Sequence, residues 1–332
     1  MPDARDELVL VTGAAGFIGS NIALTLAAQG RRVVLCDDFG DDLRWLNIRE
    51  GSFHDIIGID ALPAWLAQNK QMLAGIVHMG AISATTETDV DLIIRRNIRA
   101  TLDLCDVASE VQIPFVYASS AATYGDGTAG FEDVSQQDAL AGLVPLNAYG
   151  WSKHFVDRRL IRDRDEGRRM PPSWAGLKFF NVYGPRESHK GSMRSVIHQL
   201  WPKAAQGETV MLFASDNPDY EDGGQLRDFV HVDDCVRFAI AALDADGLAG
   251  VFNVGTGKAR SFRDLAVATF AAVGREPNLA YREMPEQLKG RYQYFTEART
   301  ERGVAAGLAP NYRSLEDGVG DYIAWLRDNP EF

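Results

Sequence analysis

Three glycines near the amino end constrain the fold more than any other feature of the chain. Gly13, Gly16 and Gly19 directly follow residues 8–11, an apolar run typical of a strand buried on both faces, and lead into a helix-period segment at residues 17–29. Glycine at these places permits a tight turn, lets backbone N–H groups approach a pyrophosphate, and lets helix and strand pack closely. The order strand, glycines, helix therefore predicts a dinucleotide-binding βαβ unit.

Two side chains downstream bear on which dinucleotide such a unit binds. Asp37 ends the next predicted strand, residues 32–36, where an acidic side chain binds the hydroxyls of the adenosine ribose. That carboxylate favours NAD, because it repels the 2′-phosphate of NADP. Arg44 follows nearby, and its forked guanidinium can bind such a phosphate. From the residues alone the choice between NAD and NADP stays open.

Strand-like and helix-like segments alternate along the first half of the chain. Further strands are predicted at residues 74–78, 115–119 and 177–180, with helices at 62–68 and 90–109. After about residue 182 the rhythm changes to a helix at 193–206 and a Gly/Asp-rich loop at 216–224, before segments 229–243 and 251–254 return to the first sheet. This order predicts an α/β fold: a Rossmann-type doubly wound parallel sheet with a smaller, interleaved α/β substrate lobe. The predicted domains are residues 1–182 with about 228–256, and about 183–227 with 257–332.

Composition narrows the class of protein. The 332 residues carry 46 acidic and 34 basic side chains, a net charge of −12, which disfavours nucleic acid and anionic membranes as partners. The cysteines, Cys36, Cys105 and Cys235, are far apart and form no CxxC pair, which indicates a reducing compartment and no structural metal. The sequence has no long uncharged apolar run and no signal-peptide pattern. These features predict a cytoplasmic globular enzyme.

The candidate catalytic residues follow the strand at 115–119. Tyr149 and Lys153 are four residues apart on a predicted helix and so share one face. A lysine ammonium beside a phenol favours the phenolate, and we expect it to lower the pKa of Tyr149 so that this side chain acts as a general base. Ser120 is placed to hydrogen-bond the reacting oxygen, and Lys153 to hold the nicotinamide ribose as well. The alternative is that Tyr149 and Lys153 are ordinary surface residues of the helix.

Together these parts resemble the extended short-chain dehydrogenase/reductase superfamily, which includes sugar-nucleotide epimerases and dehydratases. Four segments narrow the resemblance: residues 78–87 (HMGAISATTE), 181–193 (NVYGPRESHKGSM), 227–230 (RDFV) and 288–293 (LKGRYQ). With them, residues 8–327 resemble the family of ADP-L-glycero-D-manno-heptose 6-epimerases. The resemblance implies inversion at C6″ of ADP-D-glycero-D-manno-heptose, through transient oxidation with tightly bound NADP, a 6″-keto intermediate and hydride return to the opposite face. The product is a precursor for the inner core of lipopolysaccharide.

The resemblance also assigns roles to individual positions. Tyr149 and Lys190 match the two acid/base residues, and Arg44 stands where the family carries a lysine beside the 2′-phosphate, which favours NADP over NAD. The positions that match cofactor contacts, besides the glycines and Arg44, are Phe17, Ile18, Asp37, Asp38, Met79, Gly80, Ala81, Ile82, Ser83, Asn97, Lys153, Val182 and Lys190. The positions that match substrate contacts are Asn181, Ser192, Gln199, Phe213, Ala214, Ser215, Asp216, Arg227 and Tyr292.

The chain departs from the family pattern at several of these positions. Met79 replaces an acidic residue, Arg96 stands where an asparagine is usual, with Asn97 next to it, and Gln199 replaces a histidine. An apolar residue near Ile59 replaces a second cofactor lysine, and the loop at 216–224 is long. These departures affect the expected contacts to adenine and sugar and leave the acid/base pair intact.

The chemistry explains why two acid/base residues are expected. No adjacent carbonyl acidifies the carbinol C–H bond, so inversion requires hydride removal and hydride return to the other face of the ketone. The oxygen then needs an acid/base group on each side, to take its proton when hydride leaves and to give one when hydride returns, and Tyr149 and Lys190 meet that need. We expect Lys153 and nearby cations to lower the pKa of Lys190. The alternative role for Lys190 is a phosphate or ribose clamp. Candidates for holding the substrate diphosphate are Arg186, Arg227, Lys289 and Arg291.

Two other readings stay open at this point. One is a different nucleotide-sugar epimerase, dehydratase or reductase of the superfamily, although residues 120–123 lack the acid pair of a dehydratase. The other is a nucleotide-binding regulator that has lost catalysis. The resemblance further implies a homo-oligomer, with a pentamer expected.

Overall fold

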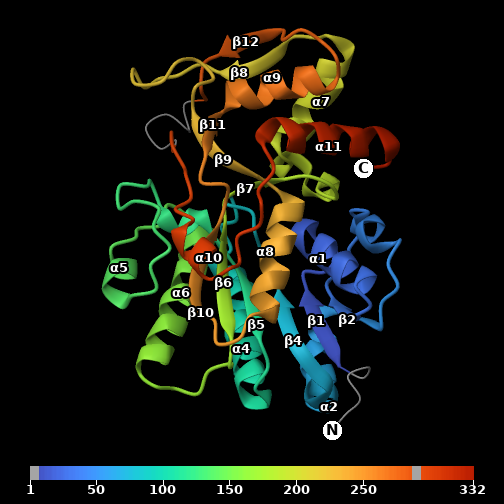
Figure 1. Cartoon of the computed structure of the whole chain (residues 1–332), viewed down its shortest axis with the longest axis vertical. Coiled ribbons are helices and arrows are strands. Elements are labelled where there is room, and N and C mark those ends of the chain that lie inside the picture. The colour runs from blue at the N-terminus through green and yellow to red at the C-terminus, as the bar shows by residue number, and fades with distance from the viewer. Residues whose placement is uncertain (1–6, 286–292) are drawn as a thin grey trace.

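The main sheet is formed by seven parallel strands in the computed structural model, which describes residues 7–285 and 293–332 (Figure 1). Their order is β10-β6-β5-β4-β1-β2-β3. The strands are β1 (Leu8–Thr12), β2 (Arg32–Cys36), β3 (Asp55–Ile57), β4 (Leu73–His78), β5 (Phe115–Ser120), β6 (Trp174–Phe179) and β10 (Ala249–Val254). The chain runs outward from β1 to β3 on one side and from β4 to β10 on the other. The predicted doubly wound parallel sheet is therefore confirmed.

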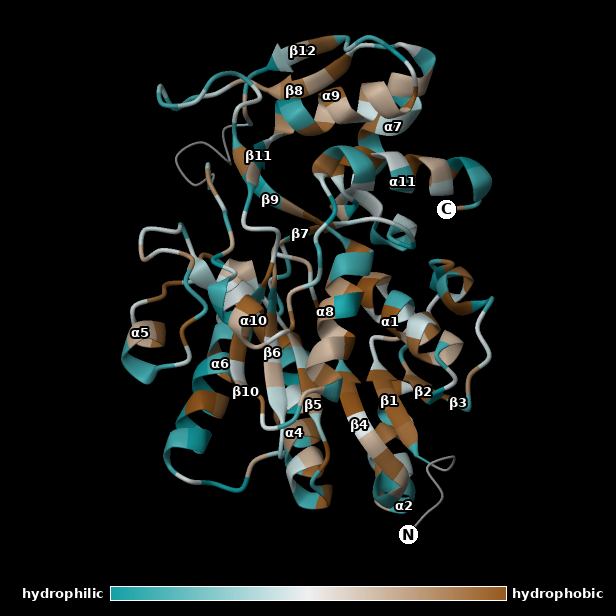
Figure 2. Ribbon diagram, in the orientation of Figure 1, coloured by the Kyte–Doolittle hydropathy of each residue, from teal (hydrophilic) through white to brown (hydrophobic). Residues whose placement is uncertain are grey.

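Helices cover both faces of this sheet, and the side chains of β1 show why its sequence is apolar throughout. Leu8 and Leu10 pack with buried residues of α4 (Ala100–Val111) and α6 (Ala148–Asp165). Val9 and Val11 point to the other face and pack with α1 (Phe17–Ala28) and α8 (Val232–Asp244). Both faces are buried, so the strand carries no polar alternation. The central strands are accordingly among the most hydrophobic parts of the ribbon (Figure 2).

Short helices complete this larger unit. They are α2 (Leu62–Asn69), α3 (Val90–Ile93), α5 (Gln137–Ala141) and α10 (Glu301–Ala305). The helix predicted at residues 90–109 is α3 and α4 joined by a π-helical turn at Ile94–Arg99.

A smaller lobe lies above the carboxyl ends of the main strands (Figure 1). It holds a three-stranded sheet in the order β11-β9-β7 and a two-stranded parallel sheet of β12 and β8. These strands are β7 (Asn181–Tyr183), β8 (Val210–Phe213), β9 (Leu226–His231), β11 (Ala259–Ser261) and β12 (Leu279–Arg282). The helices of the lobe are α7 (Val196–Gln206), α9 (Phe262–Ala272) and α11 (Leu315–Asp328), and they pack around a core of their own.

The chain crosses between the two units more than once. Strand β9 of the small lobe runs directly into α8, which packs on the main sheet, and β10 then joins the main sheet beside β6. Of the segments predicted to return to the first sheet, residues 251–254 join it in β10 and residues 232–243 pack on it in α8. Residues 229–231 do not return, because they belong to β9 of the small lobe. The division at residues 182, 228 and 256 stays a prediction. Helix α10 contacts β10, although its residues fall in the predicted second domain.

Candidate active site

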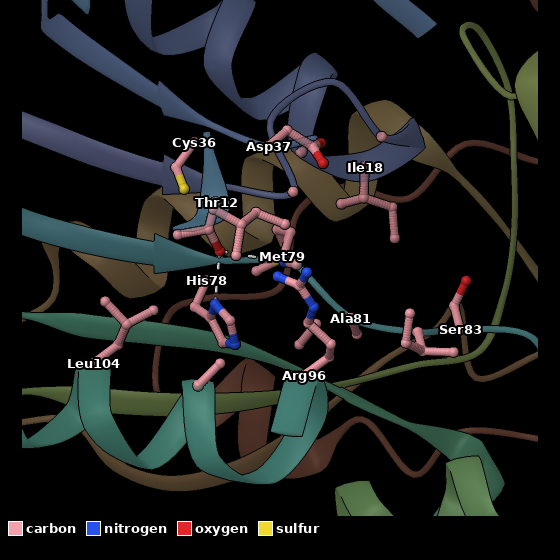
Figure 3. A pocket seen from close by; sticks show the side chains of 18 of the residues that line it. Thr12, Ile18, Cys36, Asp37, His78, Met79, Ala81, Ser83, Arg96 and Leu104 are labelled. Atoms are coloured by element: carbon pink, nitrogen blue, oxygen red, sulfur yellow. Dashed lines mark hydrogen bonds between the residues drawn. The ribbon is translucent and has the colours of Figure 1, made fainter. Parts of the chain in front are cut away.

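A cavity of about 1360 Å³ opens at the carboxyl ends of β1, β2, β4 and β5. It lies where the strand order reverses, between β1 and β4, which is where ligands bind in open α/β sheets. Figure 3 shows ten labelled side chains of its wall, Asp37, Met79 and Arg96 among them. The predicted site residues that line it are Gly13, Gly16, Phe17, Ile18, Gly19, Asp37, Asp38, Arg44, Met79, Gly80, Ala81, Ile82, Ser83, Ser120, Tyr149, Lys153, Val182 and Lys190.

The glycine loop has the geometry of a phosphate cradle. Gly13 adopts φ +64°, and a Cβ there would lie 2.5 Å from the backbone N of Gly80. A Cβ on Gly19 would lie 2.0 Å from the carbonyl oxygen of Gly13, so only glycine lets α1 approach the turn this closely. Helix α1 begins at Phe17 without a side-chain cap or an acidic residue in its first turn. Its first N–H groups therefore suit a bound anion, which is the fit a dinucleotide pyrophosphate requires.

Acidic side chains surround the adenosine end of the cavity. The buried carboxylate of Asp37 accepts hydrogen bonds from the backbone N–H groups of Ala15 and Asp38, both at 2.8 Å. Burial raises its pKa, and these two bonds oppose the rise. Arg44 lies 3.8 Å from Asp37 and is bound more closely by Asp42, at 2.5 Å. This end of the site thus contains the buried carboxylate that was predicted to bind the ribose hydroxyls and an arginine whose charge is already paired.

Arg96 lies on the same side of the cavity and was noted from the sequence only as a departure from the family. Its guanidinium is 3.5 Å from the carboxylate of Asp38 and 3.9 Å from that of Asp60. The signal that could have placed it here is its position after the loop at residues 79–83, in the helix that follows β4.

The loop after β4 is held from behind by buried polar groups. Thr12 Oγ1 lies 2.6 Å from His78 Nδ1, and His78 Nε2 lies 3.0 Å from Thr101 Oγ1 (Figure 3 shows the first contact). Burial lowers the pKa of His78 to about 3, so its ring is neutral. Asn97 is fully buried, accepts from the N–H of Ile82 at 2.8 Å and donates to its carbonyl at 3.0 Å. Asn97 thus shapes the predicted cofactor loop from outside the cavity wall.

Tyr149, Lys153 and Ser120 meet on one wall of the cavity. Helix α6 begins after Asn147, whose side chain caps it by accepting from the N–H of Gly150, and this places Tyr149 and Lys153 on successive turns. A hydrogen bond with Ser120 lowers the pKa of Tyr149, but burial outweighs it, so that the pKa of the phenol is raised. Burial also lowers the pKa of Lys153 to about 8. The expectation that Lys153 lowers the pKa of Tyr149 is therefore wrong for the chain by itself, because removal from water is the dominant effect on both groups.

A buried ion pair behind this wall was missed by the sequence reasoning. The carboxylate of Asp157 lies 2.8 Å from Lys178 Nζ, and both side chains are fully buried. Asp157 also accepts hydrogen bonds from Tyr117 Oη at 2.9 Å and Ser119 Oγ at 2.8 Å. The available signal was the position of Asp157, four residues after Lys153 on the same helix face. Asp157 lies on α6 and Lys178 on β6, while Tyr117 and Ser119 lie on β5. These contacts hold α6 against β6 and against β5, the strand that carries Ser120.

Lys190 reaches the cavity from the opposite unit. It lies in a 3₁₀ helix, Ser188–Met193, and its Nζ is 5.1 Å from the ring centroid of Phe17. The pKa of Lys190 is lowered, as expected, but the cause is burial rather than Lys153 or other cations. The buried carboxylate of Glu187 opposes this shift; it accepts hydrogen bonds from Ser195 N at 2.6 Å and Oγ at 2.5 Å.

The predicted substrate residues lie at or beyond the edge of this cavity. Asn181 adjoins the lining residues 180 and 182, and Ser192 adjoins Met193. The amide of Gln199 donates to the carbonyls of Ser192 and Arg194. The remaining predicted residues lie on the small lobe: Phe213, Ala214, Ser215 and Asp216 at the end of β8, and Arg227 on β9. Tyr292 lies outside the described residues.

The arginines expected to hold a diphosphate have protein partners. Arg227 donates to the carbonyl of Leu226 at 2.8 Å and lies over the ring of Phe262. Arg186 donates to Asn47 O and Asn21 Oδ1, both at 3.1 Å, and lies over the ring of Trp325. Arg186 therefore ties the loop before Lys190 to the segment that follows Arg44. Lys289 and Arg291 lie outside the described residues.

Comparison with known proteins agrees with this geometry. The family model for NAD dependent epimerase/dehydratase proteins matches residues 9–255, and the chain belongs to that family. An ADP-L-glycero-D-manno-heptose-6-epimerase of Fusobacterium nucleatum is 42% identical over 325 residues, which span 95% of this chain and 97% of the relative. The chain thus groups with epimerases of that name, and the resemblance inferred from its motifs is confirmed.

Solved structures support the same grouping. The ADP-L-glycero-D-manno-heptose-6-epimerase of Helicobacter pylori matches with a TM-score of 0.80 at 28% identity and covers 98% of both chains. MoeE5 in complex with UDP-glucuronic acid and NAD matches with a TM-score of 0.74 at 27% identity, over 97% of this chain and 99% of its own. The chain is an enzyme of the isomerase class, and its cofactor is a nicotinamide dinucleotide.

The described part of the chain has neither a metal-binding cluster nor a membrane-spanning helix. Within residues 7–285 and 293–332, no group of three or more His, Cys, Asp or Glu side chains is arranged to hold a metal ion. None of the helices in the described part of the chain is long and apolar enough to cross a membrane.

Proposed function

We propose that this protein inverts C6″ of ADP-D-glycero-D-manno-heptose to give ADP-L-glycero-D-manno-heptose, a step in the synthesis of lipopolysaccharide heptose. The observation that carries the proposal is the convergence of Tyr149, Lys153 and Ser120 from one unit and Lys190 from the other on a single cavity beside the glycine cradle. The names of the curated relatives supply the substrate.

The residues that would hold the dinucleotide are the glycine loop at the pyrophosphate, Asp37 at the adenosine ribose, the 79–83 loop, and Lys153 at the nicotinamide ribose. Bound there, a nicotinamide would supply the hydride acceptor and donor that inversion of the sugar carbon requires. The chain's own side chains must then move one proton off the sugar oxygen and one proton back onto it.

The opposite pKa shifts of Lys190 and Tyr149 support an order for these proton transfers. A lowered pKa favours the neutral amine of Lys190, which can accept the proton of the 6″-hydroxyl group. A raised pKa keeps the phenol of Tyr149 protonated, ready to give its proton to the oxygen on the other face. Ser120, whose hydrogen bond lowers the pKa of Tyr149, then stabilises the phenolate that remains. In the reverse direction the two residues exchange roles.

The kind of dinucleotide is a separate question. Arg44 is the residue that favours NADP, with NAD as the alternative that Asp37 favours.

The test of this function is an incubation of purified protein with ADP-D-glycero-D-manno-heptose and no added cofactor, followed by NMR. We expect conversion to the L-epimer without net oxidation, because hydride leaves and returns within one turnover. Tyr149→Phe is the matched control for contaminating activity. Absence of conversion, also after addition of NAD and of NADP, would refute the proposal. Inversion at another carbon, or of another nucleotide sugar only, would assign the protein a different substrate.

The assembly and location of the protein also remain proposals. We propose a cytoplasmic homo-oligomer, with a pentamer as the expected size. Light scattering of the eluting peak in size-exclusion chromatography gives the subunit number directly, and a monomer would contradict the expectation.

A further inference from the structure

Arg44 is held by an acidic side chain of its own loop. Its Nε donates to Asp42 Oδ1 at 2.8 Å, and its Nη2 donates to Asp42 Oδ2 at 2.5 Å. The backbone N–H of Arg44 also donates to Asp42 Oδ1, at 3.2 Å. This two-pronged contact is the geometry by which a guanidinium would otherwise bind a phosphate. It lowers the pKa of Asp42, so the carboxylate stays ionised at neutral pH.

The backbone between the two residues adopts a conformation that serves this contact. Leu43 has φ +64°, in the left-handed region that a leucine seldom occupies. Its side chain is 60% exposed, so packing does not explain the conformation. The turn at Leu43 brings the carboxylate of Asp42 back onto the side chain of Arg44. We therefore regard the Asp42–Arg44 contact as a defined part of the loop structure.

The other charged side chains near Arg44 also disfavour binding of a phosphate. The carboxylates of Asp37 and Asp42 lie 3.8 and 2.5 Å from Arg44. Asp38 and Asp60 lie 3.5 and 3.9 Å from Arg96, another cation at this end of the cavity. Within this set of contacts, four carboxylates face two guanidinium groups, a formal charge of −2. Arg95 and Lys70 line the cavity as well, and Lys70 is paired with Glu110. Arg44 Nη1 also donates to the carbonyl of Asp38 at 3.2 Å. A 2′-phosphate would add further negative charge, and to bind Arg44 through Nε and Nη2 it would displace Asp42 and lie beside the freed carboxylate.

NAD can bind without breaking the contact between Arg44 and Asp42. Its adenosine ribose presents a 2′-hydroxyl, which can donate to the Asp37 carboxylate while the Arg44–Asp42 pair stays closed. We propose that Asp42 determines the dinucleotide specificity of this site: by binding Arg44 it discriminates against the 2′-phosphate, so that the protein takes NAD in preference to NADP. The inference rests on the proposed dinucleotide site and reverses the choice that Arg44 suggested from the sequence.

The test compares wild type with Asp42→Asn, Arg44→Ala and the double variant. Two readouts that need no turnover are the dinucleotide released on denaturation, identified by mass spectrometry, and the dissociation constants of NAD and NADP measured by calorimetry on stripped protein. Asp41→Asn is the matched control, since it removes the same charge one residue earlier. Asp42→Ser repeats the test if Asp42→Asn does not fold, as judged by circular dichroism.

We expect wild type to release NAD and to bind NAD about tenfold or more tightly than NADP. Asp42→Asn should strengthen NADP binding about tenfold, the size of one charged hydrogen bond, and change NAD binding by less than about threefold. Arg44→Ala should have little effect on NADP binding in wild type and should remove the gain in the Asp42→Asn background. Asp41→Asn should shift the ratio less than Asp42→Asn does.

Other results would overturn the inference in distinguishable ways. A wild type that prefers NADP and loses this preference with Arg44→Ala would show that Arg44 is available despite Asp42. Equal shifts with Asp41→Asn and Asp42→Asn would show a general charge effect without a role for the pair. No binding of either dinucleotide by wild type would refute the site itself. Preference for NAD with no epimerisation would refute the proposed function and leave the role of Asp42 standing.

Discussion

The pKa shifts of the side chains at the two ends of the cavity have different causes. At the catalytic end, burial is the largest cause of each resolved pKa shift: it raises the pKa of Tyr149 and lowers the pKa values of Lys153 and Lys190. At the adenosine end, burial is the largest cause only for Asp37 among the three groups compared, and the shifts of Asp42 and Arg44 arise first from the hydrogen bonds between them. Burial thus prepares the catalytic side chains to exchange protons. At the other end, we infer that the Asp42–Arg44 pair selects the dinucleotide by its charge. Substitutions at the two ends should therefore differ in size and in salt dependence.

The largest effect is expected from breaking the buried ion pair behind the catalytic wall. Lys178→Met leaves the carboxylate of Asp157 uncompensated at a site with no exposure to water. We expect a loss of about 3–5 kcal/mol in the free energy of unfolding, measured with urea at pH 7. Lys70→Met is the control, because it breaks a partly exposed pair with Glu110 and should cost about 1 kcal/mol or less. Equal losses for the two variants would contradict the distinction between buried and exposed charge.

Removal of the phenolic hydroxyl tests the first acid/base residue. Tyr149→Phe should reduce epimerisation, followed by NMR, by about 10² or more, the contribution of a positioned acid/base group. Dinucleotide binding should persist, because Tyr149 is not part of the phosphate cradle. Conversion at the wild-type rate would exclude Tyr149 from the reaction.

Removal of the opposing amine tests whether a second acid/base residue is needed. Lys190→Met should also reduce epimerisation by about 10² or more, because every turnover needs a proton transfer on each face. A substrate analogue with an aldehyde at the reacting carbon needs only one of the two residues, since one molecule is oxidised while another is reduced. Lys190→Met and Tyr149→Phe should each retain that conversion. Near wild-type epimerisation by Lys190→Met would make Lys190 a clamp only.

The cost of burying Lys153 predicts a pH-dependent change in stability. Its pKa falls from 10.5 to about 8 on folding, so between these pH values the unfolded chain binds more protons and stability rises with pH. Below pH 8 the full cost applies, and Lys153→Met should stabilise the dinucleotide-free protein by about 1–3 kcal/mol. The advantage should vanish as the pH rises toward 10.5, as followed by thermal unfolding. A stability difference independent of pH would show that Lys153 is not held at a lowered pKa. The same variant should bind the dinucleotide more weakly, because Lys153 is the predicted contact to the nicotinamide ribose.

The smallest effect is expected from the exposed charges at the adenosine end. Arg96→Gln breaks contacts to Asp38 and Asp60 that are open to solvent, and we expect a change of about 1 kcal/mol or less in unfolding free energy. Raising the salt concentration from about 0.05 to 0.5 M should shrink it further. The stability loss caused by Lys178→Met should change little with salt. A salt-independent loss for Arg96→Gln would indicate that this end is drier than its contacts suggest.

Much of the fold and part of the site could be predicted because the signals are local. The run at residues 8–11 predicted a buried strand, Gly13 and Gly19 predicted the turn and the packed helix, and Tyr149 and Lys153 share a face through their spacing. Strand β3 was missed because it has only three residues at the sheet edge. Arg186 was predicted to hold the diphosphate. Its partners, Asn21 and Asn47, could not be predicted, because they lie more than 130 residues away along the chain.

The sequence by itself determined the class of fold, the family, the position of the glycine loop and the two candidate acid/base residues that line the cavity. Each of these depends on residue type and short spacing, which a chain displays before it folds. Only the tertiary structure decided which charged side chains form ion pairs and which titratable groups are buried away from water. It placed Lys178 on Asp157, showed burial as the cause of the lowered pKa of Lys190, and revealed Arg44 already bound by Asp42. Desolvation and ion pairing depend on everything that surrounds a group in space, and most of those neighbours come from distant parts of the chain.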